Sequence, residues 1–350
     1  MKIKVAASQF QTIKGNIKEN INIAINLADQ AVAEGVNIFL LQELFQTEYF
    51  CSTQNAKFFD YAISSLDNEL FSIFSNYCKK NNIVIPISFF EKQGQNYFNS
   101  LIVIDSHGEL SEVYRKSHIP DGPGYNEKFY FTPGNTGFKV FKTDFGNIGC
   151  GICWDQWFPE CARSMTLLGA DILLYPTAIG SEPHDPTINS KLHWQNVMIG
   201  HSAANQIPVI ASNRVGTETE KNISLTFYGS SFITDHMGNI IKNMDEKSEG
   251  IISQEFDLDE IKKYRQSWGN FRDREDDLIG ERVTIGAATL NVTKGIDRCV
   301  MVTRPQPGLD RDLSVLTTLL RADVTTLSVG ATVEVAGAVR VGDEVIAVPA

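Results

Sequence analysis

The sequence lacks the features of a membrane-spanning, secreted or nucleic-acid-binding protein. No apolar run approaches the roughly 18 residues that a membrane-spanning helix needs. The apolar stretch that follows Met1 is too short for the core of a signal peptide. Basic residues are in deficit, and a net charge of −11 disfavours a nucleic-acid partner. We therefore expect no membrane and no nucleic acid among its partners.

Cysteine is scarce, and its spacing is not that of a disulfide scaffold: the chain has 6 cysteines in 350 residues. Cys150 and Cys153 form a C-x-x-C pair, which leaves a redox pair or half of a zinc site open. No second C-x-x-C and no H-x-x-x-H motif accompanies it, which argues against zinc. The prediction is a reduced, cytoplasmic protein without a metal.

Two compositions follow one another along the chain. Residues 1 to about 280 are rich in Lys, Asn, Ile and Phe, whereas Arg, Val, Ala, Gly and Thr dominate beyond Gly280. In that second part Lys294 is the only lysine and Asn291 the only asparagine. We predict two domains, 1–280 and 281–350, with a fusion or chimeric join between them; a tail that merely drifted in composition is the alternative.

Within the first part, short apolar runs alternate with segments of helical periodicity. This mixture predicts an α/β fold whose sheets are covered by helices. Strands are expected at Ile3–Ser8, Ile38–Leu41, Ile83–Phe89, Asn99–Ile104, Asn147–Ile152, Ile172–Tyr175, Val209–Asn213, Gly229–Thr234 and Gly250–Phe256. Helices are expected at Ile17–Gly35, Asn68–Asn82, Glu160–Gly169, Leu192–Asn205 and Asp257–Gln266.

The most informative segment is Gly149–Asp155, which places Cys153 between a predicted strand and a turn. The helix that follows starts near Pro159. Backbone N–H groups at such an elbow lower the pKa of a thiol and can hold an oxyanion. The alternative is that Cys153 is an inert buried cysteine, as most free cysteines are.

Two further polar residues follow predicted strands. Glu43 comes after the apolar run Ile38–Leu41 and lies between Leu and Phe residues, where a carboxylate can serve as a general base. Lys116 follows a strand-like segment and could stabilise a thiolate or an oxyanion. A cysteine, a glutamate and a lysine suffice for acyl transfer by nucleophilic attack. Taken singly, Glu43 could be a helix-terminal carboxylate and Lys116 a solvated surface charge.

The segments around these three residues, Leu41–Phe45, Tyr114–Pro120 and Gly151–Asp155, resemble the three signatures of the nitrilase, or carbon–nitrogen hydrolase, superfamily. The resemblance runs from Lys2 to about Asp277. It implies a catalytic triad of Glu43, Lys116 and Cys153, a four-layer α-β-β-α sandwich, and a homo-oligomer. It implies no metal and no organic cofactor.

Finer similarity points to the branch of this family that hydrolyses N-carbamoylputrescine to putrescine, carbon dioxide and ammonia. It is carried by Asp121–Phe131, Cys153–Glu160 and Trp268–Arg274. The family commonly has a second glutamate beside its triad, and Glu127 matches it. Substrate contacts are assigned to Asp121, Tyr130, Trp154 and Asp155, with His118 and His184 as candidates for the entrance.

Relatives that take N-carbamoyl amino acids tend to carry arginines just after the cysteine motif, to pair with a carboxylate. This chain has Gln156 and Trp157 there. The acidic and aromatic residues assigned to the substrate therefore suit a ureido-amine, because they can bind its ammonium group. Structural ion pairs and hydrogen bonds are the alternative for these acids. For the whole chain, the alternatives are another ω-amidase, a β-ureidopropionase-like hydrolase, or an inactive scaffold with an interaction tail.

The last 70 or so residues resemble the C-terminal part of a MOSC domain, through Gly295–Val300 and Val341–Val345. Such domains bind a molybdenum cofactor, and Cys299 matches their metal-proximal Arg-Cys position. Too little of the barrel is present for its pterin site, so we expect a fused remnant that does not bind the cofactor. It replaces the hydrolase family's own C-terminal extension.

Overall fold

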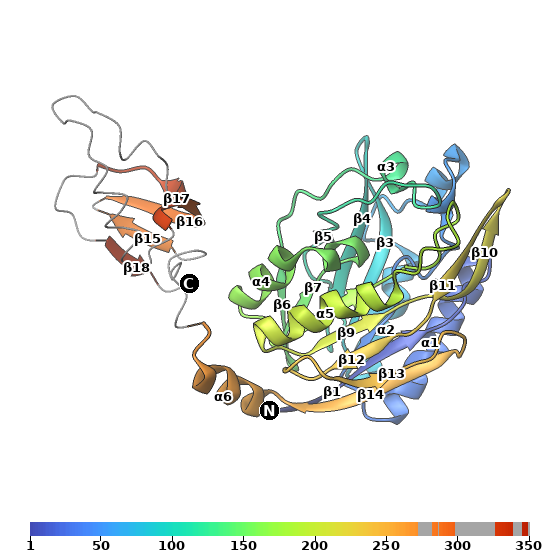
Figure 1. Cartoon of the computed structure of the whole chain (residues 1–350), viewed down its shortest axis with the longest axis horizontal. Coiled ribbons are helices and arrows are strands. Elements are labelled where there is room, and N and C mark those ends of the chain that lie inside the picture. The colour runs from blue at the N-terminus through green and yellow to red at the C-terminus, as the bar shows by residue number, and fades with distance from the viewer. Residues whose placement is uncertain (272–281, 286, 298–325, 339–344, 349–350) are drawn as a thin grey trace. The chain divides into compact units, whose positions relative to one another are not determined.

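The computed structural model describes residues 1–271, 282–285, 287–297, 326–338 and 345–348. The chain forms two compact units, Met1–Lys263 and Tyr264–Ala350 (Figure 1). The domain boundary that we expect near residue 280 remains a prediction. Among the described residues, no helix is long and apolar enough to cross a membrane.

One half of the first unit is a sheet in which β1 pairs with β14 antiparallel and with β2 parallel. A parallel bridge between Ile38 and Val84 links β2 to the start of β3, which continues antiparallel into β4 and β5. The strands are β1 (Lys2–Gln9), β2 (Ile38–Leu40), β3 (Ile85–Gln93), β4 (Asn96–Ile104), β5 (Tyr114–Arg115) and β14 (Gly250–Asp257).

The other half is a six-stranded sheet in the order β13-β12-β9-β8-β7-β6. Its centre, β7-β8-β9, is parallel, as expected where helices connect successive strands. The strands are β6 (Val140–Thr143), β7 (Gly146–Cys150), β8 (Ile172–Pro176), β9 (Val209–Ser212), β12 (Phe232–Thr234) and β13 (Ile240–Asn243). A separate hairpin joins β10 (Val215–Glu220) to β11 (Ile223–Tyr228).

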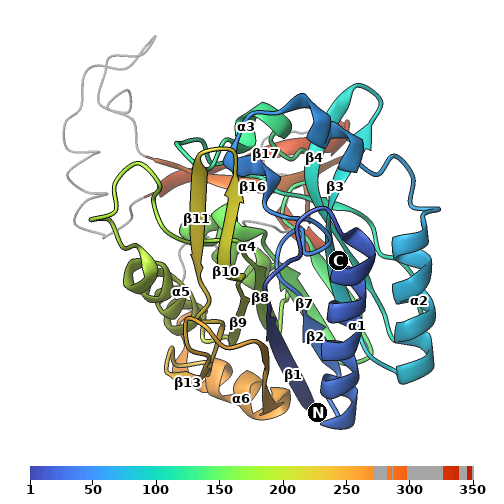
Figure 2. The ribbon, with the colours of Figure 1, turned by 90° about the vertical axis from the view of Figure 1, so that its right-hand side faces the viewer.

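Helices cover the outer faces of both sheets. Figure 2 shows α1 and α2 on one side and α5 on the other. The helices are α1 (Ile17–Ala33), α2 (Glu69–Asn81), α3 (Glu127–Tyr130), α4 (Pro159–Leu167), α5 (Lys191–Asn205) and α6 (Leu258–Trp268), with 3₁₀ turns η1 (Phe50–Ser52), η2 (Ala56–Tyr61) and η3 (Cys153–Trp157). The predicted four-layer α-β-β-α sandwich is confirmed.

Local sequence explains where the helices begin and end. The Asn16 side chain accepts a hydrogen bond from the backbone N–H of Glu19 and caps α1. Asn68 caps α2 in the same way, and Asn82 ends it in the left-handed conformation, at φ 52°. Pro159 stands in the first turn of α4, where its missing N–H costs nothing.

Three hydrophobic clusters hold the layers together. One lies between the sheets and includes Val5, Leu40 and Ile172. A second packs α1 and α2 on their sheet, and a third packs α4 and α5 on theirs. A fourth, mostly aromatic cluster around Phe50 and Phe90 lies among the loops that connect these layers. This cluster anchors the loops that carry the site described below.

The second unit is β-rich. Its antiparallel sheet has the order β17-β16-β15-β18. The strands are β15 (Arg282–Ile285), β16 (Ala288–Asp297), β17 (Thr326–Val335) and β18 (Val345–Val348). Arg282 and Glu334 form an ion pair of 2.7 Å between β15 and β17. Cys299 lies outside the described residues.

Candidate active site

Glu43, Lys116 and Cys153 come from three separate loops and meet in one buried cluster. Each follows a strand: Glu43 comes after β2, Lys116 directly after β5, and Cys153 shortly after β7. The side chains of Glu43 and Lys116 are fully buried, and Cys153 is 6% exposed. Strand ends are rigid supports for side chains that must be held at fixed distances.

Lys116 is the centre of this cluster. Its Nζ donates to Oε1 of Glu43 at 2.9 Å and to Oε2 of Glu127 at 2.6 Å. Glu127, at the first position of α3, is therefore a second carboxylate bound to Lys116; its role beside the predicted triad remains a prediction. Burial pulls the pKa of Lys116 down, but the Glu127 and Glu43 carboxylates outweigh it and hold this pKa above its ordinary value.

The two carboxylates have different surroundings. Oε1 of Glu43 also accepts from Nδ2 of Asn99 at 2.7 Å, while its Oε2 has no hydrogen-bond partner among the described residues. That oxygen can therefore accept a further hydrogen bond. Glu127 instead accepts from the Tyr49 hydroxyl at 2.8 Å. Burial raises the pKa of Glu127 to about 7, against the opposing charge of Lys116.

Cys153 stands at the elbow that its sequence predicts. Its φ of +42° lies in the left-handed region, which non-glycine residues enter at a cost of about 1 kcal/mol or more and which concentrates at functional sites. Its Sγ lies 3.9 Å from the carbonyl oxygen of Ala178. Gly151 cannot be larger, since a Cβ there would lie 2.9 Å from the Tyr175 ring.

The thiol differs from the sequence-based expectation in one respect. Burial raises the pKa of Cys153 well above its ordinary value, and the Glu43 charge adds to this, while Lys116 lowers it. This direction favours the protonated thiol. Reaction at this sulfur would require a base to take the thiol proton, because backbone N–H groups alone do not offset its burial.

A cavity of about 350 Å³ opens onto the thiol. Trp154 and Trp157 form part of its wall, with ring centroids 5.7 Å apart, and His193 packs edge-on to Trp157 at 4.7 Å. The cavity is lined by Pro120, Asp121, Gly122, Tyr125, Glu127, Cys153, Trp154, Trp157, Ala178, Ile179, Glu182, Ser190 and His193. Two of its carboxylates, Asp121 and Glu182, lie outside the buried cluster, and among the described residues no Lys or Arg lines the cavity.

The structure separates the remaining candidates. Asp121 and Trp154 line the cavity, but Tyr130 and Asp155 do not. Tyr130 is buried, and its hydroxyl donates to the Thr53 carbonyl oxygen. We therefore leave Tyr130 and Asp155 out of the proposed substrate contacts.

The two histidines suggested for the entrance do not line the cavity either. His118 hydrogen-bonds to Asp155, and His184 lies 3.9 Å from Glu182. Sequence reasoning missed Asn99, Glu182 and His193. Their positions in the chain show no pattern that distinguishes them from other surface or strand residues.

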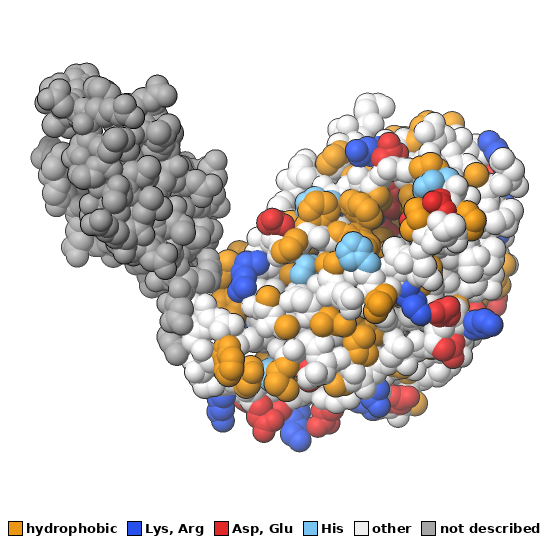
Figure 3. Space-filling model, viewed as in Figure 1, with side chains coloured by type: hydrophobic (Ala, Val, Ile, Leu, Met, Phe, Trp, Pro, Cys, Tyr) orange, Lys and Arg blue, Asp and Glu red, His pale blue; other side chains and the backbone are white. Residues whose placement is uncertain are grey.

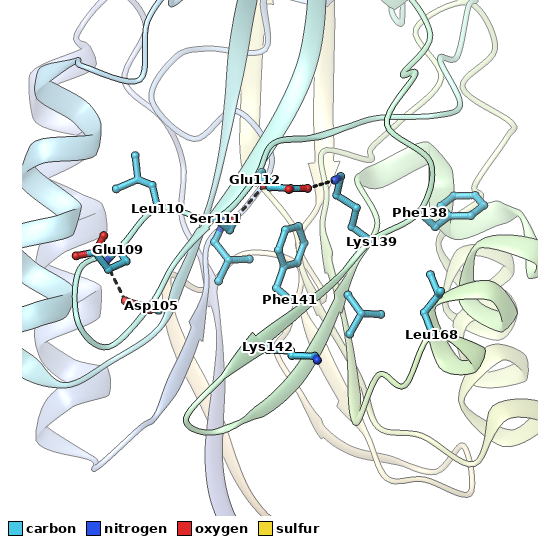
Figure 4. Close-up of a pocket in the computed structure, with 12 residues that line it drawn as sticks. Asp105, Glu109, Leu110, Ser111, Glu112, Phe138, Lys139, Phe141, Lys142 and Leu168 are labelled. Atoms are coloured by element: carbon cyan, nitrogen blue, oxygen red, sulfur yellow. Dashed lines mark hydrogen bonds and ion pairs between the residues drawn. The ribbon is translucent and has the colours of Figure 1, made fainter. Parts of the chain in front are cut away.

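Four other grooves in the described part of the chain are lined by none of the predicted site residues. The groove in Figure 4 lies between β6 and the segment after β4, and an ion pair from Lys139 to Glu112 crosses it at 2.5 Å. Another groove lies beside α1 and α2. On the face shown in Figure 3, hydrophobic and histidine side chains gather over α4 and α5, where Leu192 is 66% exposed.

Within the part of the chain that the structure describes, no group of three or more His, Cys, Asp or Glu side chains could hold a metal ion. The described cysteines Cys51, Cys78, Cys150, Cys153 and Cys161 are free. Cys150 is buried and burial raises its pKa, so it has the character of a core residue rather than a redox partner.

Comparisons with known proteins agree with this geometry. The N-carbamoylputrescine amidase of Oryza sativa is 50% identical over 288 residues, which cover 81% of this chain and 95% of that protein. The citrullinase of Francisella tularensis is 50% identical over 281 residues, 80% of this chain and 98% of that protein. The crystal structure of a carbon–nitrogen hydrolase from Helicobacter pylori matches with a TM-score of 0.74 and 39% identity, covering 79% of this chain and 97% of that one.

Family profiles divide the chain into two matches. The MOSC domain profile matches residues 269–346, which confirms the resemblance of the C-terminal segment. The carbon–nitrogen hydrolase profile matches residues 4–266 and so spans the buried cluster, the cavity and both sheets. By profile, by relatives and by fold, the chain belongs to the carbon–nitrogen hydrolase family.

Proposed function

We propose that this enzyme hydrolyses N-carbamoylputrescine to putrescine, carbon dioxide and ammonia. The observation that carries this proposal is the charge pattern of the cavity. A thiol with its base and lysine lies at one end, while Asp121 and Glu182 supply negative charge elsewhere on a wall to which no described Lys or Arg contributes. A ureido group joined to an alkyl ammonium fits this pattern.

Glu182 is the stronger of the two candidates for binding the ammonium. It is partly buried, and this burial raises its pKa, while the charge of His184 lowers it. A partly desolvated carboxylate gains more from a cationic ligand than a fully hydrated one does. The tryptophan rings nearby add a favourable surface for a cation.

The proposed reaction proceeds through a covalent intermediate. Glu43 takes the proton of the Cys153 thiol as the sulfur attacks the carbamoyl carbon. Lys116 and the backbone N–H of Trp154 hold the oxyanion that forms. Glu43 returns the proton to the departing nitrogen, and ammonia leaves.

A water molecule then completes the cycle. Glu43 takes a proton from this water, whose oxygen attacks the thiocarbamate carbon. The C–S bond breaks and the proton passes to the sulfur, which restores the thiol. The released carbamic acid decays to carbon dioxide and the free amine.

Citrulline is the second candidate, because one relative with 50% identity is named a citrullinase. Citrulline carries an α-carboxylate as well as an ammonium, and a carboxylate needs a cationic or N–H partner. The described part of the chain contributes no Lys or Arg side chain to the cavity wall. The described pocket therefore favours the diamine derivative.

Ammonia release from N-carbamoylputrescine, citrulline and N-carbamoyl-β-alanine tests this proposal. We expect the highest kcat/KM with N-carbamoylputrescine. A higher value for either carboxylate substrate would overturn the specificity, and absence of turnover with all three would overturn the activity itself.

A matched pair of substrates tests the role of Glu182. N-butylurea is N-carbamoylputrescine without its ammonium. Glu182→Gln should raise KM for N-carbamoylputrescine about tenfold, since a charge-assisted hydrogen bond contributes about 1.5–3 kcal/mol. Turnover of N-butylurea should stay unchanged in this variant. An equal effect on both substrates would contradict the assignment.

The cellular setting also belongs to this proposal. Five described cysteines are free, which suits a reducing compartment, and we place the activity in the cytoplasm. Assembly into a homo-oligomer remains a prediction, which size-exclusion chromatography with light scattering can test.

A further inference from the structure

Asp155 occupies an unusual position: it is fully buried, it is acidic, and it lies two residues after the nucleophile without lining the cavity. A buried carboxylate is costly unless its oxygens accept hydrogen bonds. The groups that donate hydrogen bonds to Asp155 therefore indicate the role of this residue.

One carboxylate oxygen accepts a hydrogen bond from the backbone at the Cys153 elbow. Oδ2 of Asp155 accepts from the backbone N–H of Ile152 at 3.0 Å. Ile152 immediately precedes Cys153, whose left-handed φ must be held against its intrinsic preference. The same Oδ2 accepts from the Tyr114 hydroxyl at 2.7 Å.

The other oxygen accepts hydrogen bonds from the segment that carries Lys116, residues 114–118, called the Lys116 loop here. Oδ1 accepts from the backbone N–H of His118 at 3.0 Å and lies 2.8 Å from Nδ1 of the same residue. Tyr114 and His118 stand two residues on either side of Lys116. The imidazole is fixed by stacking on Phe158, with ring centroids 3.6 Å apart and an angle of 8°.

We propose that Asp155 is a positioning residue that couples the Cys153 elbow to the Lys116 loop. A single carboxylate accepts hydrogen bonds from groups next to the nucleophile and from both sides of the lysine. It thereby fixes the distance between the sulfur and the ammonium that stabilises its charge. An error of about 1 Å in such a distance can cost about a hundredfold in rate.

Asp155→Asn tests this role, because asparagine keeps the shape but replaces one acceptor with an NH₂ donor. Either orientation of the amide turns this donor toward two groups that now donate to the carboxylate. We expect kcat to fall at least tenfold while KM changes less than threefold. Alkylation of Cys153 by iodoacetamide, followed by peptide mass spectrometry, should slow by a similar factor.

Glu91→Gln is the matched control. Glu91 is also buried, and it forms a bidentate ion pair with Arg115, the residue before Lys116. Within the described structure it makes no hydrogen bond to the Cys153 elbow. Both variants should lose thermal stability. With assays run equally far below each Tm, Glu91→Gln should keep kcat and the alkylation rate within threefold of the wild type.

Two results would overturn the proposal: Asp155→Asn that keeps both rates within threefold, or Glu91→Gln that loses them equally. If Asp155→Asn does not fold, the double variant Tyr114→Phe and His118→Phe carries the test. It keeps the carboxylate and the aromatic stack but removes two of its four donors. We expect it to lose at least tenfold in both rates, and unchanged rates would overturn the proposal.

This inference rests on the chemistry proposed for Cys153 and not on the choice of substrate. Alkylation requires no substrate. If the wild-type enzyme turns over none of the ureides, the proposed function fails. The rate at which iodoacetamide alkylates Cys153 still tests the role of Asp155 in that case.

Discussion

Replacing Glu127 with glutamine should change the pH dependence of the reaction. Glu127 is buried, hydrogen-bonds to Lys116 and Tyr49, and has a pKa raised to about 7 by burial. When Glu127 is protonated, the charge of Lys116 is balanced by Glu43 alone. The bond from Lys116 to Glu127 is then weaker because its acceptor is uncharged, so the ammonium is held less firmly beside the thiol.

The magnitude follows from the fraction of enzyme in which Glu127 is ionised. With a pKa of about 7, roughly a tenth of the carboxyl groups are ionised at pH 6 and roughly nine tenths at pH 8. We therefore expect kcat/KM of the wild type to rise about tenfold between pH 6 and its plateau, because this parameter reports ionisations of the free enzyme.

In Glu127→Gln this rise of kcat/KM between pH 6 and the plateau should disappear. The plateau should also fall about tenfold, because the hydrogen bond from Lys116 to residue 127 loses its negatively charged acceptor. The assay is ammonia release at substrate concentrations below KM, from pH 5.5 to 8.5. His193→Asn is the control, since it removes a titratable side chain from the same cavity and should keep the inflection. An inflection near pH 7 that survives in Glu127→Gln would refute this reasoning.

Three other variants test the cluster and its support. Cys153→Ser should abolish turnover yet leave Tm nearly unchanged, since the hydrogen bond that the thiol makes within the described structure is long, at 3.9 Å; turnover near the wild-type rate would exclude Cys153 as the nucleophile. Asn99→Ala removes the N–H donor to Glu43, and steady-state kinetics should show kcat about tenfold or more below the wild type, because losing a buried donor costs about 1–3 kcal/mol. Gly134→Ala would place a Cβ 2.1 Å from a backbone carbonyl oxygen of β5, so a thermal melt should show a clear loss of stability; Gly122→Ala, which meets nothing within 4 Å, is its neutral control.

Much of the fold could be predicted from the sequence because its signals are local. The predicted helix at Ile17–Gly35 is observed as α1, Ile17–Ala33, since its apolar spacing and its Asn16 and Gly35 flanks lie within one segment. The hairpin β10–β11 was missed, because its strands alternate buried and exposed residues without a long apolar run. The strand-like segment expected before Lys116 is observed as the short strand β5, which ends at Arg115.

For the site, the sequence by itself determined the candidates for the triad, since Glu43, Lys116 and Cys153 each lie in a recognisable motif at the end of a strand. Only the tertiary structure decided the surroundings of these side chains. The high pKa of the Cys153 thiol and the raised pKa of Glu127 depend on burial, and burial is the sum of contacts from distant segments. In the same way, Asp155 could be assigned to the substrate or to the scaffold until its four donors were located.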